Sequence, residues 1–185
     1  MNAMNEFVKP TLVLAIICLV ITALLSVSHE ITQPIIDENE RKTAEIARAE
    51  VLTEADSFEQ IEGEFPEGVQ EVYKAANGAG YTVTITSKGY SSDPLKVMVG
   101  LKEDGTIERI KVLANNETPG LGSKVSNDDF VNQFEGMDSS MENFEAIGGA
   151  TISSNAMKRA IESAFQVYET VKGEEGRWKN RICKS

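Results

Sequence analysis

The sequence is poor in the residue types from which most metal sites are built. Its 185 residues include two cysteines, Cys18 and Cys183, and a single histidine, His29. The cysteines form no CxxC pair and no Cys/His cluster, which excludes ordinary zinc, iron–sulfur and c-type haem attachment sites, so we expect no metal ligands. A lone histidine beside an apolar run is typical of an interfacial polar residue.

Basic residues are also scarce. The chain carries 18 Lys and Arg against 29 Asp and Glu, for a formal net charge of −11. An acidic body without a basic stripe argues against nucleic acid and anionic lipid surfaces as partners. A hydrophobic content of 41% with 25% charged residues is nevertheless that of a globular protein, so global disorder is not expected.

Charge is absent from residues 11–27, TLVLAIICLVITALLSV. This length, with Pro10 before it, predicts one transmembrane helix. Lys9 precedes the run, and the next basic residues are Arg41 and Lys42. Positive-inside logic leaves the N-terminus in the cytoplasm. We therefore predict a single-pass protein of the cell (inner) membrane whose body is extracytoplasmic.

A cleaved signal peptide is the alternative, because Ser26, Val27 and Ser28 form a small-x-small cleavage pattern. The run is longer than a typical signal h-region of ~7–15 residues. Glu6 also offsets the charge of Lys9 in the preceding segment. These features favour an uncleaved anchor, and the body is extracytoplasmic under either interpretation.

Hydrophobic periodicity predicts an α+β body: a small antiparallel sheet packed with helices. Residues 80–90 alternate apolar side chains with threonines, as in a strand with one face on a core. Residues 94–101 and 106–114 flank Asp104-Gly105, a strong hairpin signal. Residues 127–134 predict a short helix, and apolar residues recurring at three and four from Met157 predict an amphipathic helix.

These segments suggest four regions along the chain. They are an N-terminal tail and transmembrane helix (1–30), a charged helix and linker (31–70), a sheet-and-helix domain (71–173) and a polar tail (174–185). The last helix is expected to begin near Ser154 and to end near Gly173. Trp178, in the tail, is interpreted as a surface or partner contact.

Two loops have the composition of binding sites. Residues 115–124, NNETPGLGSK, follow a strand and contain two glycines that permit close approach to the backbone. They match neither a Walker A loop nor a dinucleotide fingerprint, and a tight surface turn accounts for them when taken alone.

The second loop, residues 146–157, reads AIGGATISSNAM. It places Thr151 behind two bare glycines and ahead of a helix N-terminus, where backbone N–H groups and the helix dipole favour an anion. The residues alone thus suggest a phosphate-binding or phospho-accepting threonine, with a plain helix cap as the alternative.

Together, ETPGLGSK, the later GGAT and ISS, and the single anchor resemble the FMN-binding domain of Rnf and sodium-pumping NADH:quinone reductase complexes. Order, spacing and length resemble most the G subunit of Rnf-type ferredoxin:NAD oxidoreductases, over residues 10–171. In that family FMN is joined through its phosphate to the threonine that ends a D-x-x-S/T-G-A-T/S motif, and a flavin transferase makes the bond from FAD.

The resemblance implies that Thr151 carries FMN as a phosphoester. Glu145 stands where the family usually has Asp or Asn, Gly148 where it has Ser or Thr, and Asn115 where it has histidine. Thr118, Leu121 and Gly122 are candidates for packing against the flavin ring, with Glu117 and Lys124 as polar partners of the loop or cofactor. The full candidate cofactor-binding set lies in the two loops: Glu117, Thr118, Gly120, Leu121, Gly122, Lys124, Gly149, Ala150, Ser153 and Ser154.

We therefore expect an electron-relay subunit of a membrane-bound, ion-translocating ferredoxin:NAD oxidoreductase complex. It would be a redox subunit without catalytic residues of its own, because the flavin supplies the redox chemistry. Its expected partners are other subunits of the complex, the membrane and, during maturation, a flavin transferase. The alternatives are a component like the C subunit of a sodium-pumping NADH:quinone reductase, a non-catalytic membrane-anchored scaffold domain and a stand-alone flavoprotein reductase.

Overall fold

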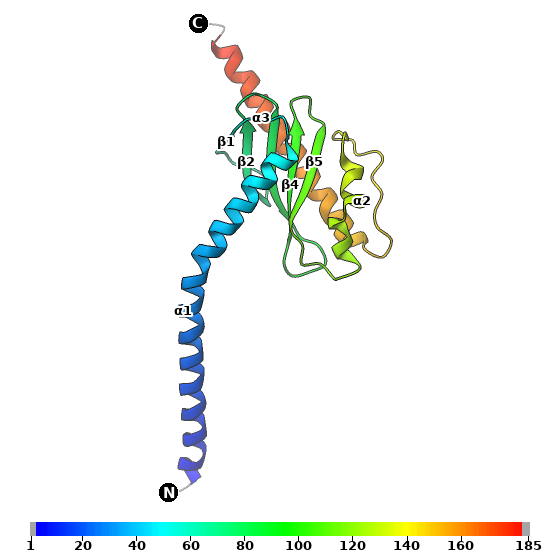
Figure 1. Ribbon diagram of the computed structural model, residues 1–185. Helices are drawn as coiled ribbons and strands as arrows, with labels where there is room; N and C mark the ends of the chain where they lie inside the picture. The colour runs from blue at the N-terminus through cyan, green and yellow to red at the C-terminus, as the bar shows by residue number, and fades with distance from the viewer. Residues whose placement is uncertain (1–2, 183–185) are drawn as a thin grey trace. The chain divides into compact units, whose positions relative to one another are not determined.

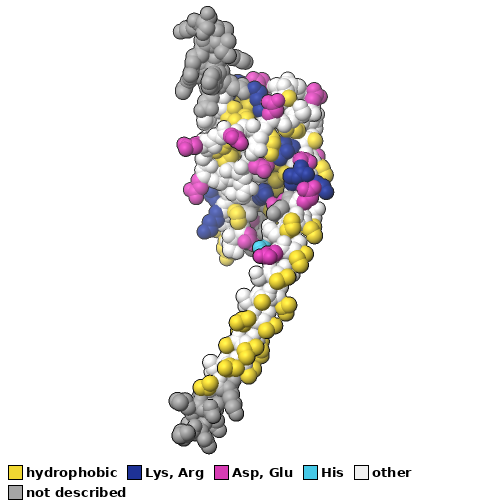
Figure 2. Space-filling model, turned by 90° about the vertical axis from the view of Figure 1, so that its left-hand side faces the viewer, with side chains coloured by type: hydrophobic (Ala, Val, Ile, Leu, Met, Phe, Trp, Pro, Cys, Tyr) yellow, Lys and Arg dark blue, Asp and Glu magenta, His cyan; other side chains and the backbone are white. Residues whose placement is uncertain are grey.

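The computed structural model describes residues 3–182 and divides the chain into two compact units, Met1–Thr43 and Ala44–Ser185. The described residues of the first unit form a single helix, part of α1 (Ala3–Val51). Apolar side chains of its described residues are exposed (Figure 2), for example Leu19 at 71% and Leu24 at 66%. By length and composition this is the one described helix that can cross a membrane, as predicted for residues 11–27.

The second unit is built on a five-stranded antiparallel sheet in which every strand pairs with its neighbour in sequence. Figure 1 shows the long helix α3 (Thr151–Ile182) across one face of this sheet. The predicted α+β class is confirmed, and so are the three predicted strands. The strands are β1 (Phe58–Gln60), β2 (Val69–Ala75), β3 (Gly80–Ser87), β4 (Leu95–Lys102) and β5 (Ile107–Ala114).

The sequence did not predict β1 and β2 as strands. β1 has only three residues, within the segment interpreted as a linker, and β2 has a mixed burial pattern without clean alternation. Both are held by pairing with the next strand, which a period in the sequence does not report.

The β4–β5 hairpin forms at Asp104 and Gly105, as predicted. Gly105 has a φ of 86°, a conformation that glycine adopts without steric cost. The carboxylate of Asp104 accepts hydrogen bonds from the hydroxyl and the backbone N–H of Thr106, at 2.7 and 2.9 Å. These bonds stabilise the ionised carboxylate and lower the pKa of Asp104.

The main core lies between the sheet and α3. Side chains of one face of β3 and β4, among them Val83 and Val97, are fully buried there against side chains of α3 such as Ile161. The short helices η1 (Gly122–Ser126), α2 (Asp128–Val131) and η2 (Asn132–Phe134) add Val125, Phe130 and Phe134 to the same core. The short helix expected over residues 127–134 is thus confirmed as α2 followed by η2.

The other face of the sheet is also partly covered, whereas the period of two in residues 80–90 predicted one face on a core. Thr82 and Thr84 are 1% and 3% exposed. The last turns of α1 pack over this face, where Val51 and Ala47 form a small second core with Met98. A Cβ at Gly100 would overlap the carbonyl oxygen of Val51, so the helix and β4 lie in direct backbone contact there.

Both expected ends of the last helix were wrong. It begins at Thr151, because the N–H of Ser154 bonds to the carbonyl of Ala150 and closes the first turn there. It continues to Ile182, because Gly173 does not adopt the positive φ with which glycine terminates helices. The tail from residue 174 is therefore mainly helical. The side chain of Trp178 and the whole of Cys183 lie outside the described residues, and the role of Trp178 stays a prediction.

Candidate functional site

A glycine turn leads directly into α3. The N–H of Ala150 bonds to the carbonyl of Ile147 at 3.0 Å, and Gly149 has a φ of 81°, so residues 147–150 form a turn that requires glycine at its third position. Gly148 is different: its φ is not positive, and no described atom lies within 4 Å of a Cβ built there. The turn therefore depends on Gly149, while a side chain at Gly148 would lie in open space.

Two side chains fix this segment by accepting hydrogen bonds from its backbone N–H groups. The buried hydroxyl of Ser154 accepts a 3.0 Å hydrogen bond from the N–H of Ile147, and the side-chain oxygen of Gln133 accepts one of 2.9 Å from the N–H of Glu145. Because Ser154 lies in the first turn of α3 and Gln133 in η2, the segment before Thr151 is fixed to two different elements.

The loop at residues 115–124 is closed by its own hydrogen bonds. The carbonyl of Thr118 accepts bonds from the N–H groups of Leu121 and Ser123, and the hydroxyl of Ser123 accepts one from the N–H of Gly120. Gly120 has a φ of 76° and open space around it. Asn115 bonds through its side chain to the N–H of Glu117 and to the carbonyl of Ser123, so it ties the two ends of this loop together.

The structure brings the two predicted loops together. Leu121 is 3.8 Å from a Cβ built on Gly149, and the hydroxyl of Ser153 donates a 2.6 Å hydrogen bond to the carboxylate of Glu117. Gly122 lies in this junction, where a Cβ would come 2.5 Å from the hydroxyl oxygen of Ser153. Of the predicted site residues, Glu117, Gly122, Ala150, Ser153 and Ser154 are buried, while Thr118, Gly120, Leu121, Lys124, Gly149 and Thr151 are exposed.

Thr151 is the first residue of α3, and its side chain is exposed. No interaction with another described residue holds its hydroxyl. The first N–H groups of a helix lack intrahelical carbonyl partners and lie at the positive end of the helix dipole. An anionic group on this hydroxyl would therefore lie in a favourable field, with open space over Gly148.

Three exposed apolar side chains come from the segments that meet at this junction: Tyr90 at 72%, Leu121 at 49% and Ile152 at 54% exposure. We call them the apolar patch. Tyr90 joins the junction because its N–H donates to the carboxylate of Glu117 at 3.0 Å. Exposed aliphatic and aromatic side chains on segments that meet near a candidate attachment point are suited to contact a flat aromatic group.

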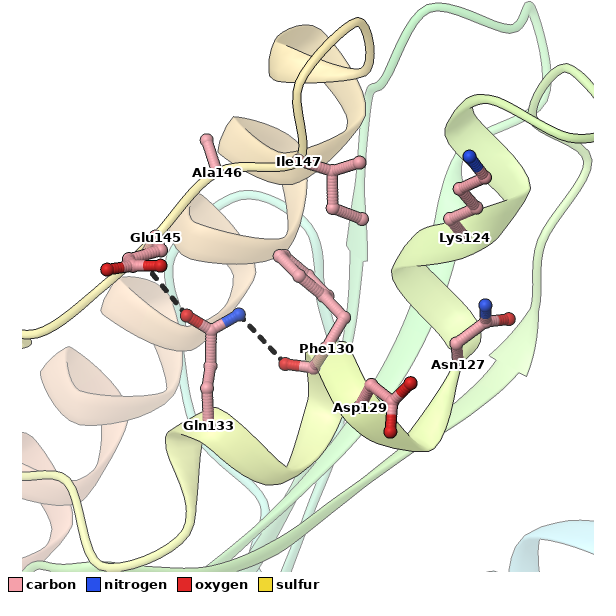
Figure 3. A pocket seen from close by; sticks show the side chains of 8 residues that line it. All are labelled: Lys124, Asn127, Asp129, Phe130, Gln133, Glu145, Ala146 and Ile147. Carbon is pink, nitrogen blue, oxygen red and sulfur yellow. Dashed lines mark hydrogen bonds between the residues drawn. The ribbon is translucent and has the colours of Figure 1, made fainter.

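A cavity of about 360 Å³ is lined in part by the segment before the turn, residues 145–147 (Figure 3). Figure 3 shows Gln133 between Glu145 and Phe130, bonded to both, with Lys124 on the opposite wall. The cavity combines apolar and charged walls. It is lined by Lys124, Asn127, Asp129, Phe130, Gln133, Glu145, Ala146 and Ile147.

Sequence reasoning missed Gly89, Tyr90 and Ile152 as parts of this site. Tyr90 follows β3 in a stretch of Gly and Ser that has the composition of an ordinary loop. Its one signal was a large aromatic residue in a segment of small residues. Ile152 was interpreted as part of the helix and not as an exposed neighbour of the threonine.

Two family models match the chain. The FMN-binding domain family matches residues 89–166, which include both loops, and the RnfG N-terminal region matches residues 1–60. The first match begins at the glycine that precedes Tyr90, so it covers the whole junction described above.

Curated relatives match over nearly the full length. The chain is 33% identical to the G subunit of the Na⁺-translocating ferredoxin:NAD⁺ oxidoreductase complex of Acetobacterium woodii, with 88% of this chain and 92% of the relative covered. It is 26% identical to the G subunit of the proton-translocating ferredoxin:NAD⁺ oxidoreductase complex of Clostridium ljungdahlii, covering 91% and 95%. The G subunit of an ion-translocating oxidoreductase complex of Methanosarcina acetivorans is 29% identical over 95% of this chain and 100% of the relative.

Proposed function

This chain belongs to the family of G subunits of Rnf-type, ion-translocating ferredoxin:NAD⁺ oxidoreductase complexes, and from this premise we propose that it is the electron-relay subunit of such a complex and carries FMN on Thr151. The observation that supports this attachment is the exposed Thr151 hydroxyl at the N-terminus of α3, behind the turn at residues 147–150. The relatives named above differ in the ion that they translocate. Membership of this family therefore indicates the ferredoxin:NAD⁺ couple but does not identify the ion.

The residues present fit a phosphate-linked flavin. The hydroxyl is accessible, the space over Gly148 is open, and the N–H groups of the first turn of α3 favour the phosphate charge. When bound, FMN supplies one- and two-electron redox chemistry, for which the described side chains offer no substitute. The chain itself would hold the phosphate at the helix N-terminus and present the apolar patch to the ring.

We place the flavin ring against the apolar patch. Leu121 lies near Gly149 in the turn before Thr151, 3.8 Å from a Cβ built on that glycine, and Ile152 follows Thr151 in the chain. A ring resting on exposed side chains keeps one face open to a neighbouring subunit, which an electron relay requires. The cavity beside Phe130 is the alternative site for the ring.

Attachment requires a separate enzyme. No base among the described residues is hydrogen-bonded to the Thr151 hydroxyl, so this chain does not activate its own nucleophile. A flavin transferase acting on FAD supplies that activation. The Thr151 oxygen bonds to the FMN phosphorus, the FAD pyrophosphate bond breaks, AMP leaves and the hydroxyl proton is released.

Intact-mass spectrometry after co-expression with a flavin transferase tests the proposal. Wild type should be heavier than the bare chain by one FMN minus one water, and a peptide containing residues 146–157 should carry the increment. Thr151→Ala should lack it, and Thr151→Ser should retain part of it because a hydroxyl remains. An increment that persists in Thr151→Ala, or never forms in wild type beside an active transferase, would leave the scaffold function as the better description.

We further propose that α1 anchors the domain outside the cytoplasm, with the N-terminus inside. The support is the uncharged run at residues 11–27 and the position of Lys9 before it. With this orientation the flavin would face the extracytoplasmic side, and the covalent bond would prevent its loss to the medium.

A further inference from the structure

Glu117 is a buried carboxylate whose partners are all uncharged. Its side chain is 4% exposed. It accepts hydrogen bonds from the N–H of Tyr90 at 3.0 Å, the N–H of Ser91 at 3.2 Å and the hydroxyl of Ser153 at 2.6 Å. No lysine or arginine in the described part of the chain pairs with it.

The burial of this carboxylate costs free energy of folding. Burying a carboxylate without a cation is unfavourable, and only the three donors offset the lost hydration. The chain also leaves room for it at two positions: a Cβ at Gly89 would overlap a carboxylate oxygen, and one at Gly122 would come 2.9 Å from the other. The carboxylate therefore occupies a space formed by three segments distant in sequence.

The three segments are those that carry the exposed groups of the flavin site. Ser153 lies in the first turn of α3, two residues after Thr151. Leu121 and Gly122 lie in the second segment, the loop at residues 115–124, and Tyr90 lies in the third, the loop after β3. Since Glu117 bonds to the first and third segments and belongs to the second, it joins the start of α3 to the loops that carry Leu121 and Tyr90.

We infer that Glu117 is the positioning residue of the flavin site, which holds the Thr151 hydroxyl and the apolar patch in the geometry that accepts FMN. This inference rests on the proposed function. Because Glu117 is buried at the junction, it would act through Ser153 and Tyr90 and not by contact with the flavin.

Two substitutions separate hydrogen-bond geometry from charge. In Glu117→Gln, the amide oxygen can accept from Tyr90 and Ser91, while the amide nitrogen donates to the hydroxyl of Ser153, which can reverse its role. All three bonds persist without the charge. In Glu117→Ala all three are lost, and the buried N–H groups of Tyr90 and Ser91 lose their acceptor.

The test measures the rate at which the full-length, detergent-solubilised chain gains FMN from FAD and a flavin transferase, followed by intact mass, together with the melting temperature. Glu117→Ala should be labelled roughly tenfold or more slowly than wild type, since displacing a reacting group by about 1 Å can cost up to ~100-fold. Glu117→Gln should restore labelling towards the wild-type rate. Visible circular dichroism of the attached flavin should change in Glu117→Ala and not in Glu117→Gln.

Met98→Ala is the stability control. Met98 is fully buried in the second core, on the opposite face of the sheet from α3, so its truncation lowers the melting temperature without touching the junction. It should be labelled at the wild-type rate. If Glu117→Ala does not fold, Ser153→Ala removes one of the three bonds and should slow labelling less but in the same direction.

Three results would overturn the inference: folded Glu117→Ala (or, in its place, Ser153→Ala) labelled as fast as wild type, Glu117→Gln as slow as Glu117→Ala, or Met98→Ala slowed to the same extent. Each of these results requires that the wild-type chain is labelled on Thr151. A wild-type chain that takes no FMN, or takes it on another residue, contradicts the proposed function instead, so the two failures are distinguishable.

Discussion

The N–H of Ile147 donates a 3.0 Å hydrogen bond to the hydroxyl of Ser154, which is completely buried. This bond joins the start of the glycine turn to the first turn of α3 and so sets where Thr151 lies. Two neighbouring hydroxyl residues therefore have opposite environments. The hydroxyl of Ser154 is buried and holds the turn, whereas Thr151 is exposed to solvent.

The two hydroxyls should differ in their effect on stability. Ser154→Ala should lower the free energy of unfolding by ~1–3 kcal/mol, because the Ile147 N–H loses its acceptor. Thr151→Ala should change it by less than ~0.5 kcal/mol, because Thr151 is exposed and is not the N-cap. Urea unfolding of the two variants measures the difference. Equal losses would mean that Thr151 caps the helix after all.

The two glycines of the TPGLG loop should also differ. Gly122→Ala places a Cβ against Ser153 and Glu117 and should cost ~1–3 kcal/mol while changing the flavin environment. Gly120→Ala should cost ~1–2 kcal/mol because of the positive φ at this position. It should leave the flavin spectrum unchanged, because the new methyl group would meet no described side chain within 4 Å. Melting curves and visible spectra of both variants decide the point. A flavin change in Gly120→Ala alone would contradict it.

The position of the flavin ring can be tested with an exposed pair. Leu121→Ala removes part of the apolar patch and should shift the absorption and raise the fluorescence of the attached FMN. Asn127→Ala alters the wall of the cavity beside Phe130 and should change neither property. Both residues are solvent-accessible, so stability should change by less than ~0.5 kcal/mol. The reverse pattern would place the ring in the cavity.

Gly100 should be among the least tolerant glycines of the sheet. Gly100→Ala forces apart β4 and the backbone of Val51 and should cost at least ~2 kcal/mol, because a backbone carbonyl cannot rotate away as a side chain can. Gly148→Ala is the matched control, with open space and no positive φ, and should be neutral within ~0.5 kcal/mol. Chemical denaturation compares the two. Similar values would show that α1 does not press on β4.

The orientation of the domain is open to a protease experiment. Protease added to intact spheroplasts should digest the body of the chain while it sediments with the membrane. Complete protection would reverse the proposed orientation. Recovery of a mature chain that starts at His29 would identify residues 1–28 as a cleaved signal peptide and remove the anchor.

Several features of this protein were determined by local sequence. The apolar run at residues 11–27, the period of two in residues 80–86 and the Asp104-Gly105 turn each depend on neighbours in the chain, so their structures followed from spacing and residue type. The candidate attachment residue belongs to the same class, because GGAT before an amphipathic helix is a short contiguous pattern. The comparisons confirmed the family that this pattern indicated.

Other features were decided by contacts between distant segments. Thr82 and Thr84 are buried because the end of α1 covers their face of the sheet, and β1 exists because β2 offers it a partner. Glu117, Tyr90 and Ser153 meet across 36 residues between the carboxylate and the hydroxyl, and across 27 between the carboxylate and Tyr90. Periodicity reports which way a side chain points along its own element. It carries no record of what packs against that face, and so the junction around Glu117 emerged only when the sheet, the two loops and α3 were assembled.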